Sequence, residues 1–455
     1  MRINRGFFNC LGVIAGCMAL VCLTSPAVAQ VASAQLIEDG ALPGLPGETV
    51  DSISNSAVNH AGGYAFTVNT SGSGTTLSHA WGNPLGGMGS VMRTEGIFGD
   101  YDQSSFESFF GIGDAGQVAY SAISTHIPSG TTGIDGVWLD DNPMMNEEQP
   151  YPHLPGYYWS FGSRPGCTAD GQAYWVGGIT DTQGGSTQIR GLYFGAGATE
   201  VLMGGTAIGG VAELIEPGGL DFDVRFSALG ANYLTPVTVD ATSTDDGVVV
   251  LNGNALMAGG SIVREASPVP PGIGGLVGEN WDNFDFMGIT EAGSYLVTGD
   301  TDADTAMDEF VMLDGQIALR EGDPVADGVL DGAIEGAYLN ENGDFACIWD
   351  ITNADGNFEA LFFNGDLVLM EGDLVDWNND GIIDALDQGA FLTNFTGSSA
   401  LTLGDRYGAN LADIYFTADC DVGGSTLEGG FRMTVPEPAT LSLLLLSTVA
   451  LLRRR

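Results

Sequence analysis

The feature that most constrains this chain is a short motif that returns about every fifty residues. Its clearest copies are residues 59–66 (NHAGGYAF) and 340–347 (NENGDFAC), which share Asn, Gly and Ala at the same offsets. Two further apolar runs follow each clear copy, with turn residues between them. An Asn-x-x-Gly turn that leads into a half-buried strand, a hairpin and an outer strand makes a unit of about three or four strands. Repetition of such a unit indicates a repeat architecture and not one single sheet.

The spacing of the copies predicts the fold class. Neighbouring turn glycines in the clear copies lie 54, 55 and 50 residues apart. These glycines are Gly62, Gly116 and Gly171 in the first half of the chain, and Gly293 and Gly343 in the second. A fourth copy is blurred near residues 227–233, and a seventh keeps only residues 413–417 and 429–433. Strand-turn-strand units with a period near fifty are typical of an all-β protein with the β-propeller fold.

The two ends of the repeat region predict how the ring closes. The seventh copy lacks its closing strand, whereas residues 34–40 look like a closing strand with no opening strands before it. Joining these two pieces completes one blade from both ends of the chain, and no sheet edge then stays open. We therefore expect a propeller of seven blades of antiparallel strands, closed by the N-terminal strand. An open array, or two smaller sandwiches, is the alternative.

The first residues have the pattern of a secretory signal peptide. Arg2 and Arg5 precede an apolar run that ends in Ala-Val-Ala, so we expect cleavage after residue 29. The alternative is a lipidated terminus at Cys17, because Ile-Ala-Gly precedes this cysteine. The chain then divides into a signal peptide (1–29), a repeat β-propeller domain (30–434) and a C-terminal sorting segment (435–455).

The C-terminal segment combines a short motif, an apolar run and terminal positive charge. Pro436, Glu437 and Pro438 are followed by a mostly apolar run and then by three arginines. This run is short for a free-standing transmembrane helix, and the arginines favour the cytoplasmic side. The order of these parts closely resembles the PEP-CTERM sorting signal of bacteria. The resemblance implies export, anchoring in the inner membrane through a C-terminal transmembrane helix, and processing by an exosortase-type enzyme on the way to the cell surface or extracellular matrix. An ordinary C-terminal anchor is the alternative.

The repeats also resemble a described family. Exported bacterial proteins carry tandem repeats of the form NxxGxxAF, usually followed by an outer strand that ends in Glu-Gly-Asp. The match is strongest at Asn59 and Asn340, and Glu-Gly-Asp stands at residues 321–323 and 371–373. The resemblance implies a repeat domain over most of residues 30–434. It brings no catalytic residues that could be assigned to this chain.

The charge of the repeat domain excludes nucleic acid and phospholipid surfaces as partners. Residues 30–434 contain 8 Arg, no Lys and 57 acidic residues, which gives a formal charge of −49. Such a surface repels phosphate groups and favours divalent cations. We therefore expect contact with the membrane only through the C-terminal helix.

One stretch has the spacing of a calcium-binding loop. Within residues 376–387, side chains with oxygen donors fall at positions 1, 3, 5, 9 and 12, and Gly381 at position 6 permits a sharp turn. Hard oxygen ligands at these positions are typical of a Ca²⁺ loop, in which position 7 contributes a backbone carbonyl. We therefore predict a Ca²⁺ site with these ligands: Asp376, Asn378, Asp380, Ile382, Asp384 and Asp387. A solvated acidic turn is the alternative.

This loop, with the helix expected over residues 385–395, resembles one half of a dockerin repeat. A dockerin has two such halves and only one is visible here, so binding to a cohesin is not expected. The last ligand is Asp in place of a bidentate Glu, which lowers the expected affinity. A second acidic run, residues 300–308, lacks glycine at its sixth position. We expect this run to be a polar hairpin loop, with a second Ca²⁺ site as the alternative.

No residue pattern indicates a catalytic site. The four histidines are scattered without an HExxH motif, and the sequence has no GxSxG motif. Residues 111–116 spell GxGxxG, but no helix is expected after them, which excludes a dinucleotide site. The aromatic residues between positions 151 and 159 are expected to pack in the core or at a blade edge, with stacking on a sugar ring as the alternative.

These patterns favour a non-catalytic exported protein of the cell surface or extracellular matrix, with a calcium-stabilised propeller as a binding or structural module. Extracellular polysaccharide and surface proteins are the expected partners. The alternative is an exported glycan-active enzyme that uses acidic residues at the propeller channel. A pair of carboxylates clustered at the channel mouth would favour the enzyme, and a channel lined only by small residues would favour the module.

Overall fold

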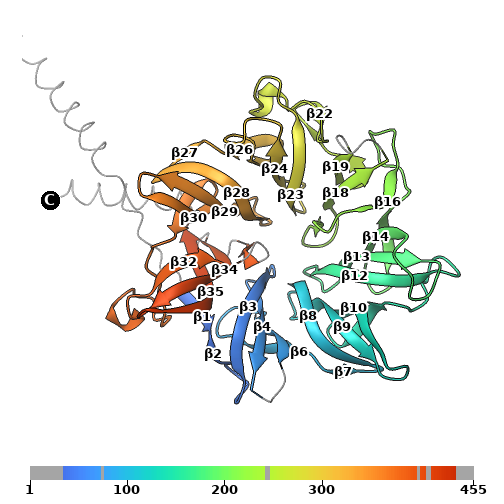
Figure 1. Ribbon diagram of the computed structural model, residues 1–455, viewed down its shortest axis with the longest axis horizontal. Helices are drawn as coiled ribbons and strands as arrows, with labels where there is room; N and C mark the ends of the chain where they lie inside the picture. The colour runs from blue at the N-terminus through green and yellow to red at the C-terminus, as the bar shows by residue number, and fades with distance from the viewer. Residues whose placement is uncertain (1–33, 73–75, 241–245, 397–399, 406–410, 437–455) are drawn as a thin grey trace, which may run out of the picture.

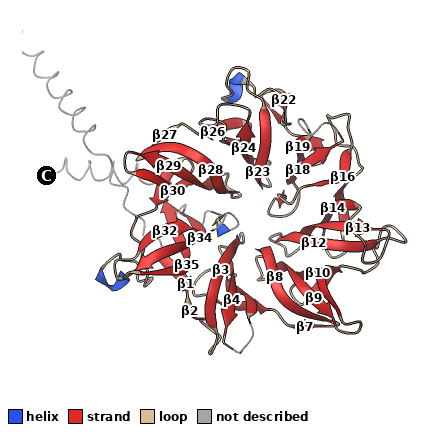
Figure 2. Ribbon diagram, in the orientation of Figure 1, coloured by secondary structure: helices blue, strands red, loops and turns tan. Residues whose placement is uncertain are grey.

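The computed structural model of this chain describes residues 34–72, 76–240, 246–396, 400–405 and 411–436. Their strands form seven blades in a ring around a central axis (Figure 1). Strands and loops make up nearly all of the described chain, and its helical residues belong to the 3₁₀ turns η1 (Pro271–Ile273) and η2 (Ala385–Asp387) and to the 3₁₀ residue Ala400 (Figure 2). The predicted all-β propeller with seven blades is therefore confirmed.

The first three blades follow the chain in order, and the first long strand of each lies nearest the axis (Figure 1). Blade 1 is β3 (Thr49–Val58), β4 (Tyr64–Ser71), β5 (Leu77–Asn83) and β6 (Ser90–Thr94), with β2 (Gly40–Ala41) beside β3. Blade 2 is β8 (Tyr101–Ile112), β9 (Val118–His126), β10 (Thr131–Leu139) and β11 (Asn142–Asn146), with β7 (Ile97–Phe98) beside β8. Blade 3 is β12 (Tyr158–Cys167), β13 (Ala173–Thr180), β14 (Ile189–Phe194) and β15 (Thr199–Met203).

The remaining blades keep the same antiparallel order. Blade 4 has a split first strand, β16 (Ile215–Leu220) and β17 (Arg225–Phe226), then β18 (Tyr233–Val239), β19 (Gly247–Leu251) and β20 (Asn254–Ala255). A small hairpin of β21 (Met257–Ala258) and β22 (Ser261–Ile262) follows it. Blade 5 is β23 (Trp281–Ile289), β24 (Tyr295–Thr301), β25 (Phe310–Leu313) and β26 (Gln316–Arg320). Blade 6 is β28 (Gly328–Leu339), β29 (Phe345–Asn353), β30 (Gly356–Phe363) and β31 (Asp366–Met370), with β27 (Pro324–Val325) beside β28.

Blade 7 is built from both ends of the chain. Its C-terminal part comprises β32 (Phe391–Phe395), β33 (Thr402–Leu403), β34 (Leu411–Val422) and β35 (Ser425–Pro436). Its outer strand is β1 (Ala34–Glu38), which pairs with β35 through Gln35 opposite Phe431 and Glu38 opposite Gly429. The predicted closure of the ring by the N-terminal strand is therefore confirmed.

The repeated motif forms the turn between the first and second strands of a blade. In blade 1 the side-chain oxygen of Asn59 accepts hydrogen bonds from the amides of Ala61 and Gly63. The Asn59 amide group donates to the carbonyl of Gly113, which belongs to blade 2. Asn340 does the same in blade 6, with a hydrogen bond to Gly404 of blade 7. The conserved spacing of Asn and Gly thus shapes a turn and also ties each of these blades to the next.

The strand after this turn is more deeply buried than its sequence pattern predicts. Ala65 and Phe66 in blade 1, and Ala346 and Cys347 in blade 6, all have 0% exposure. Neighbours along a strand point to opposite faces, so both faces of these strands are covered. The expectation of half-buried strands was wrong because each blade lies between two other blades.

The predicted membrane and export segments fall mostly outside the described residues. The signal peptide (1–29) and the apolar tail beyond residue 436 are not among them. β35 extends to Pro436, so the first two residues of the predicted sorting segment belong to the last strand. Among the described residues, no helix has the length and apolar character needed to cross a membrane.

Candidate functional site

The central channel contains a cavity of about 100 Å³ that is lined by residues from all seven blades. Most of its lining residues lie on the innermost strands or in the turns that follow them. The lining includes aromatic and charged side chains, so the channel is not lined only by small residues. The acidic and basic residues in the lining are His60, Arg164, Asp223, Arg225, Glu341 and Asp405.

Acidic residues at the mouth of the channel connect the blades. The Glu341 carboxylate accepts hydrogen bonds of 2.7 Å from the amides of Ala228 in blade 4 and Glu291 in blade 5. Asp405 of blade 7 accepts a hydrogen bond of 2.7 Å from the Glu341 amide and also contacts the ring of His60 in blade 1. These carboxylates are close together, but their oxygens are occupied by protein donors.

Two further acids also accept hydrogen bonds from another blade. Asp114 accepts hydrogen bonds from the amides of His60 and Ala61 in the preceding blade. Glu291 accepts hydrogen bonds from the Ser227 hydroxyl and the Leu229 amide, which also belong to the preceding blade. The second residue of the motif turn therefore often serves as an acceptor between blades.

His60 is the basic partner in this ring of acceptors. Burial lowers the pKa of His60, but the hydrogen bond and charge of Asp405 and the charges of Glu341 and Asp114 raise it above its ordinary value overall. A protonated His60 is thus favoured at the junction of blades 7 and 1. This junction is also the place where the two ends of the chain meet.

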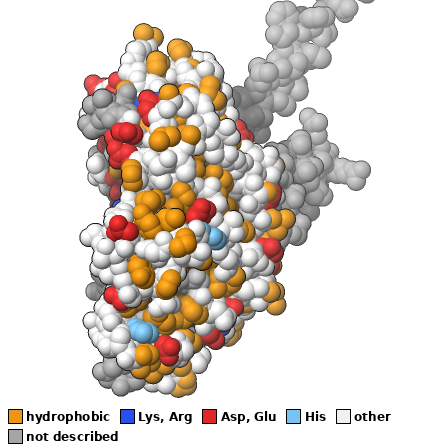
Figure 3. Space-filling view, turned by 90° about the vertical axis from the view of Figure 1, so that its right-hand side faces the viewer, with side chains coloured by type: hydrophobic (Ala, Val, Ile, Leu, Met, Phe, Trp, Pro, Cys, Tyr) orange, Lys and Arg blue, Asp and Glu red, His pale blue; other side chains and the backbone are white. Residues whose placement is uncertain are grey.

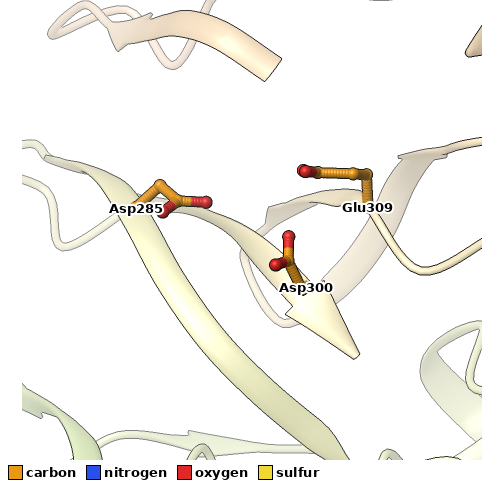
Figure 4. Close-up of side chains that lie close together, drawn as sticks. All are labelled: Asp285, Asp300 and Glu309. Atoms are coloured by element: carbon orange, nitrogen blue, oxygen red, sulfur yellow. The ribbon is translucent and has the colours of Figure 1, made fainter. Parts of the chain in front are cut away.

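A second acidic cluster lies in blade 5, where Asp285 on β23, Asp300 on β24 and Glu309 directly before β25 point toward one another (Figure 4). One carboxylate oxygen of each lies within 4.8 Å of the others. Asp300 Oδ1 and Glu309 Oε2 are buried and have no hydrogen-bond partner among the described residues. Three carboxylates at this separation repel one another unless they hold protons or a cation.

The pKa values of this cluster are shifted in the direction that the repulsion demands. Burial and the charge of Asp300 raise the pKa of Glu309 to about 9. Burial and the same charge raise the pKa of Asp285 to about 6. Asp221 and Asp223 of blade 4 add to the shift of Asp285. At neutral pH the structure therefore favours a proton on Glu309.

The same arrangement recurs in the next two blades. Asp350 lies directly opposite Glu359 in blade 6, and Asp419 lies directly opposite Glu428 in blade 7. Glu359 and Glu428 each accept a hydrogen bond from a backbone amide in the first strand of the following blade. Like charges opposite one another destabilise a sheet, so these pairs stabilise the junctions only through such donors.

The predicted calcium loop connects β31 of blade 6 to β32 of blade 7. All six predicted ligands lie in this one loop, with Asp376 and Asp387 fully buried and the other four exposed. The Asp376 carboxylate accepts hydrogen bonds from the amides of Asp380 and Gly381. The Asp387 carboxylate accepts from the amides of Trp377, Asn378 and Asp384. The six residues thus share one loop, but the donor atoms of its acids do not form a group as close as that of Asp285, Asp300 and Glu309 in blade 5. Ca²⁺ binding by this loop stays a prediction.

The helix expected after this loop is absent from the described residues. The chain forms one 3₁₀ turn, η2, and then enters β32 at Phe391. The expectation of a helix over residues 385–395 was wrong, because these residues supply the first strand that blade 7 requires. The likeness to half of a dockerin repeat is therefore limited to the loop itself.

The structure also shows where two other sequence features lie. Residues 302–309 connect β24 to β25 as a loop, although Asp300 before it belongs to the acidic cluster of blade 5. The rings of Tyr151 and Trp159 are buried and meet edge to face at 4.8 Å. These two aromatic residues form part of the core, as expected from the sequence.

Comparisons with known proteins give distantly similar solved structures and no family match. No protein-family model and no curated protein matches it. Among solved structures it is similar to prolyl oligopeptidase B from Galerina marginata, with 9% identity and a TM-score of 0.32, over 82% of this chain and 56% of that one. It is also similar to PorZ, a bacterial surface component of the type-IX secretion system of Porphyromonas gingivalis, with 11% identity and a TM-score of 0.22, over 87% of this chain and 54% of that one. The chain thus spans little more than half the length of either structure.

Proposed function

We propose that this chain is a non-catalytic exported protein of the cell surface or extracellular matrix whose propeller serves as a binding or structural module. One observation carries this proposal: the carboxylates at the channel mouth, Glu341 and Asp405, are held by donors from other blades. Carboxylates used in this way brace the ring and are not free to exchange protons with a substrate. A braced propeller is a rigid support for binding.

The proposal includes a Ca²⁺ ion in the Asp376 loop. The spacing of oxygen-donor side chains in this loop, with two buried carboxylates among them, supports it, because Ca²⁺ prefers oxygen ligands presented by one loop. The loop is also tied to the closing strand, since the Gln35 amide of β1 donates a hydrogen bond of 3.0 Å to the carbonyl of Asp376. An ion in this loop would therefore stabilise the junction at which the ring closes.

The proposal also places the protein outside the cytoplasm. The signal-peptide pattern and the resemblance of residues 435–455 to a sorting signal support export, anchoring in the inner membrane and processing by an exosortase-type enzyme. The expected partners are extracellular polysaccharide or other surface proteins. The strong negative charge supports the exclusion of nucleic acid.

A glycan-active enzyme is the second candidate. Glu309 holds a proton at neutral pH, as a general acid must, and Asp285 and Asp300 lie beside it. However, its Oε2 atom is buried, which does not suit proton transfer to a polysaccharide. The module therefore has the stronger support.

The two candidates are separated by one experiment on the full chain. Acidic and neutral polysaccharides are incubated with the protein, and both retention in affinity electrophoresis and release of reducing ends are measured. We expect retention without release. Release of reducing ends that disappears in Glu341→Gln or Glu309→Gln would overturn the proposal and establish the enzyme.

A further inference from the structure

The central channel holds an unusual share of the positive charge of this protein. Residues 30–434 contain only 8 Arg against 57 acids, yet Arg164 and Arg225 both line the channel cavity. On the side of the molecule shown in Figure 3, acidic side chains lie at separate points and arginine is almost absent. The cavity therefore brings together two arginines, in contrast to the face shown in Figure 3.

Arg164 lies on β12 at a register shift, between Ser163 and Gly166, in the pairing with β13. Its guanidinium lies 3.5 Å from the carboxylate of Asp223 in blade 4. Burial lowers the pKa of Arg164, Asp223 raises it, and the nearby charge of Arg225 lowers it again. Arg164 and Arg225 are thus near enough for their positive charges to repel each other. The carboxylate of Asp223 pairs mainly with Arg164.

Arg225 reaches the channel from β17, in the split first strand of blade 4. Its guanidinium carbon lies 5.8 Å from the ring centre of Tyr338, which belongs to blade 6. Among the described residues, no carboxylate forms an ion pair with Arg225. Tyr174 and Tyr338 both line the same cavity and give it apolar walls. The guanidinium of Arg225 therefore faces an aromatic ring, and its charge acts on the Asp223 carboxyl without an ion pair between them.

The acidic residues that line the cavity do not form an ion pair with Arg225. Asp223 is paired with Arg164, whereas Glu341 and Asp405 accept amides and the His60 ring at the mouth. An anion placed between the two guanidinium groups would relieve their repulsion. Guanidinium groups bind carboxylate, sulfate and phosphate oxygens through paired, charge-assisted hydrogen bonds.

We propose that the channel binds a small oxyanion, namely a carboxylate, sulfate or phosphate group, between Arg164 and Arg225. A cavity of about 100 Å³ has room for such a group on a small molecule or on the end of a larger one. This inference rests on the proposed function, because it names the chemistry of the ligand that the module holds.

The test is isothermal titration calorimetry of the full chain with acetate, sulfate and inorganic phosphate, each compared with chloride at equal ionic strength. We expect at least one of the three to bind and to identify the preferred group. Arg225→Gln and Arg164→Gln should each weaken binding at least tenfold. The matched control is Arg93→Gln, because Arg93 pairs with Asp140 and does not line the cavity; its affinity should stay within twofold of wild type.

Circular dichroism and thermal melts establish whether each variant is folded. If Arg225→Gln does not fold, Arg225→Lys decides, because it keeps the charge and loses the planar fork; its affinity should fall severalfold. The inference is overturned if wild type binds none of the three anions more tightly than chloride, or if the folded Arg225 variant binds as wild type does. Retention of polysaccharide without anion binding would overturn this inference alone, whereas release of reducing ends would overturn the proposed function alone.

Discussion

Replacing Glu309 with glutamine is expected to stabilise this protein at neutral and alkaline pH. Glu309 lies against Asp285 and Asp300, and burial together with the charge of Asp300 raises the pKa of its carboxyl from 4.5 to about 9. Below pH 4.5 the carboxyl is protonated in both the folded and the unfolded chain. As the pH rises from about 4.5 to about 9, the unfolded chain releases this proton more readily, so the folded state loses stability.

The size of the effect follows from the pKa shift. At about 1.36 kcal/mol per pKa unit, holding Glu309 in the fold costs roughly 3 kcal/mol at pH 7 and roughly 6 kcal/mol at pH 9, as upper limits. The residue is only half-buried, and water screens its charge. We therefore expect Glu309→Gln to raise the free energy of unfolding by about 1–2 kcal/mol at pH 7. With an unfolding entropy of roughly 2 cal/mol/K per residue, this corresponds to a rise in Tm of about 2 °C.

The assay is a set of thermal melts of the full chain in chelator at about pH 5, 7 and 9. The rise in Tm should be small at pH 5 and should grow steadily toward pH 9. The matched control is Asp366→Asn, which also removes one negative charge but from an exposed position on β31. A rise that is equal at all three pH values, or that Asp366→Asn reproduces, would refute the argument that Glu309 is held protonated by its neighbours.

Three further predictions concern the loop, the closing strand and the tail. Millimolar Ca²⁺ should stabilise the wild type by about 2.7 kcal/mol at a hundredfold excess over Kd. In thermal melts, Asp376→Ala or Asp380→Ala should remove most of this gain, while Asp302→Ala should keep it. A wild type with no Ca²⁺-dependent shift in Tm would show that the loop is only a turn. Deleting residues 34–39 should expose the edge of β35 and lower Tm or cause aggregation, and a deletion variant that melts as wild type does would contradict the closure. Replacing residues 436–438 should leave the protein in the inner-membrane fraction, and unchanged release would rule out sorting by this tail.

The fold could be predicted from sequence because its signal is local and repeated. Asn59, Gly62 and Ala65 stand within seven residues, and the hydrogen bonds of the turn explain why this spacing returns in Asn340 and Gly343. The repeat region has one strand too many at its N-terminal end and lacks one at its C-terminal end. This predicted that the ring closes through the N-terminal strand, and the pairing of β1 with β35 confirms it. Local chemistry repeated at a fixed period was sufficient for architecture.

The innermost strands, which line the channel, were harder to predict. β28 has two shifts in its pairing with β29, between Leu330 and Ile334 and between Ile334 and Gly336. Such bulges interrupt the alternation of polar and apolar residues on which a strand prediction depends. In blade 7 the first strand was mistaken for a helix. The contact of Arg164 with Asp223, and the approach of Arg225 to Tyr338, also join different blades, so no local pattern in the sequence announces them.

The acidic pairs were visible in the sequence and were missed. Asp300 and Asp350 each stand seven residues after a turn glycine, Gly293 and Gly343 respectively. Aligning the copies at these glycines would have placed both aspartates on the second strand. Their Glu partners, Glu309 directly before the third strand and Glu359 on it, would then have followed from the hairpin. The offset was a usable signal because the repeat fixes the position of each residue in its blade.

The carboxylates of this protein give it two opposite dependences on pH. Burial raises the pKa of Glu291, but hydrogen bonds from Ser227 and from the amides of Leu229 and Ala231 lower it below its ordinary value overall. The stability that Glu291 contributes is therefore present above its unfolded pKa and is lost as the pH falls. The raised pKa of Glu309 has the opposite sign, since its contribution is lost as the pH rises toward about 9. With few arginines to pair with, the carboxylates depend on backbone amides and retained protons. The ring should therefore be most stable between these limits, and replacing Glu309 should extend only the alkaline one.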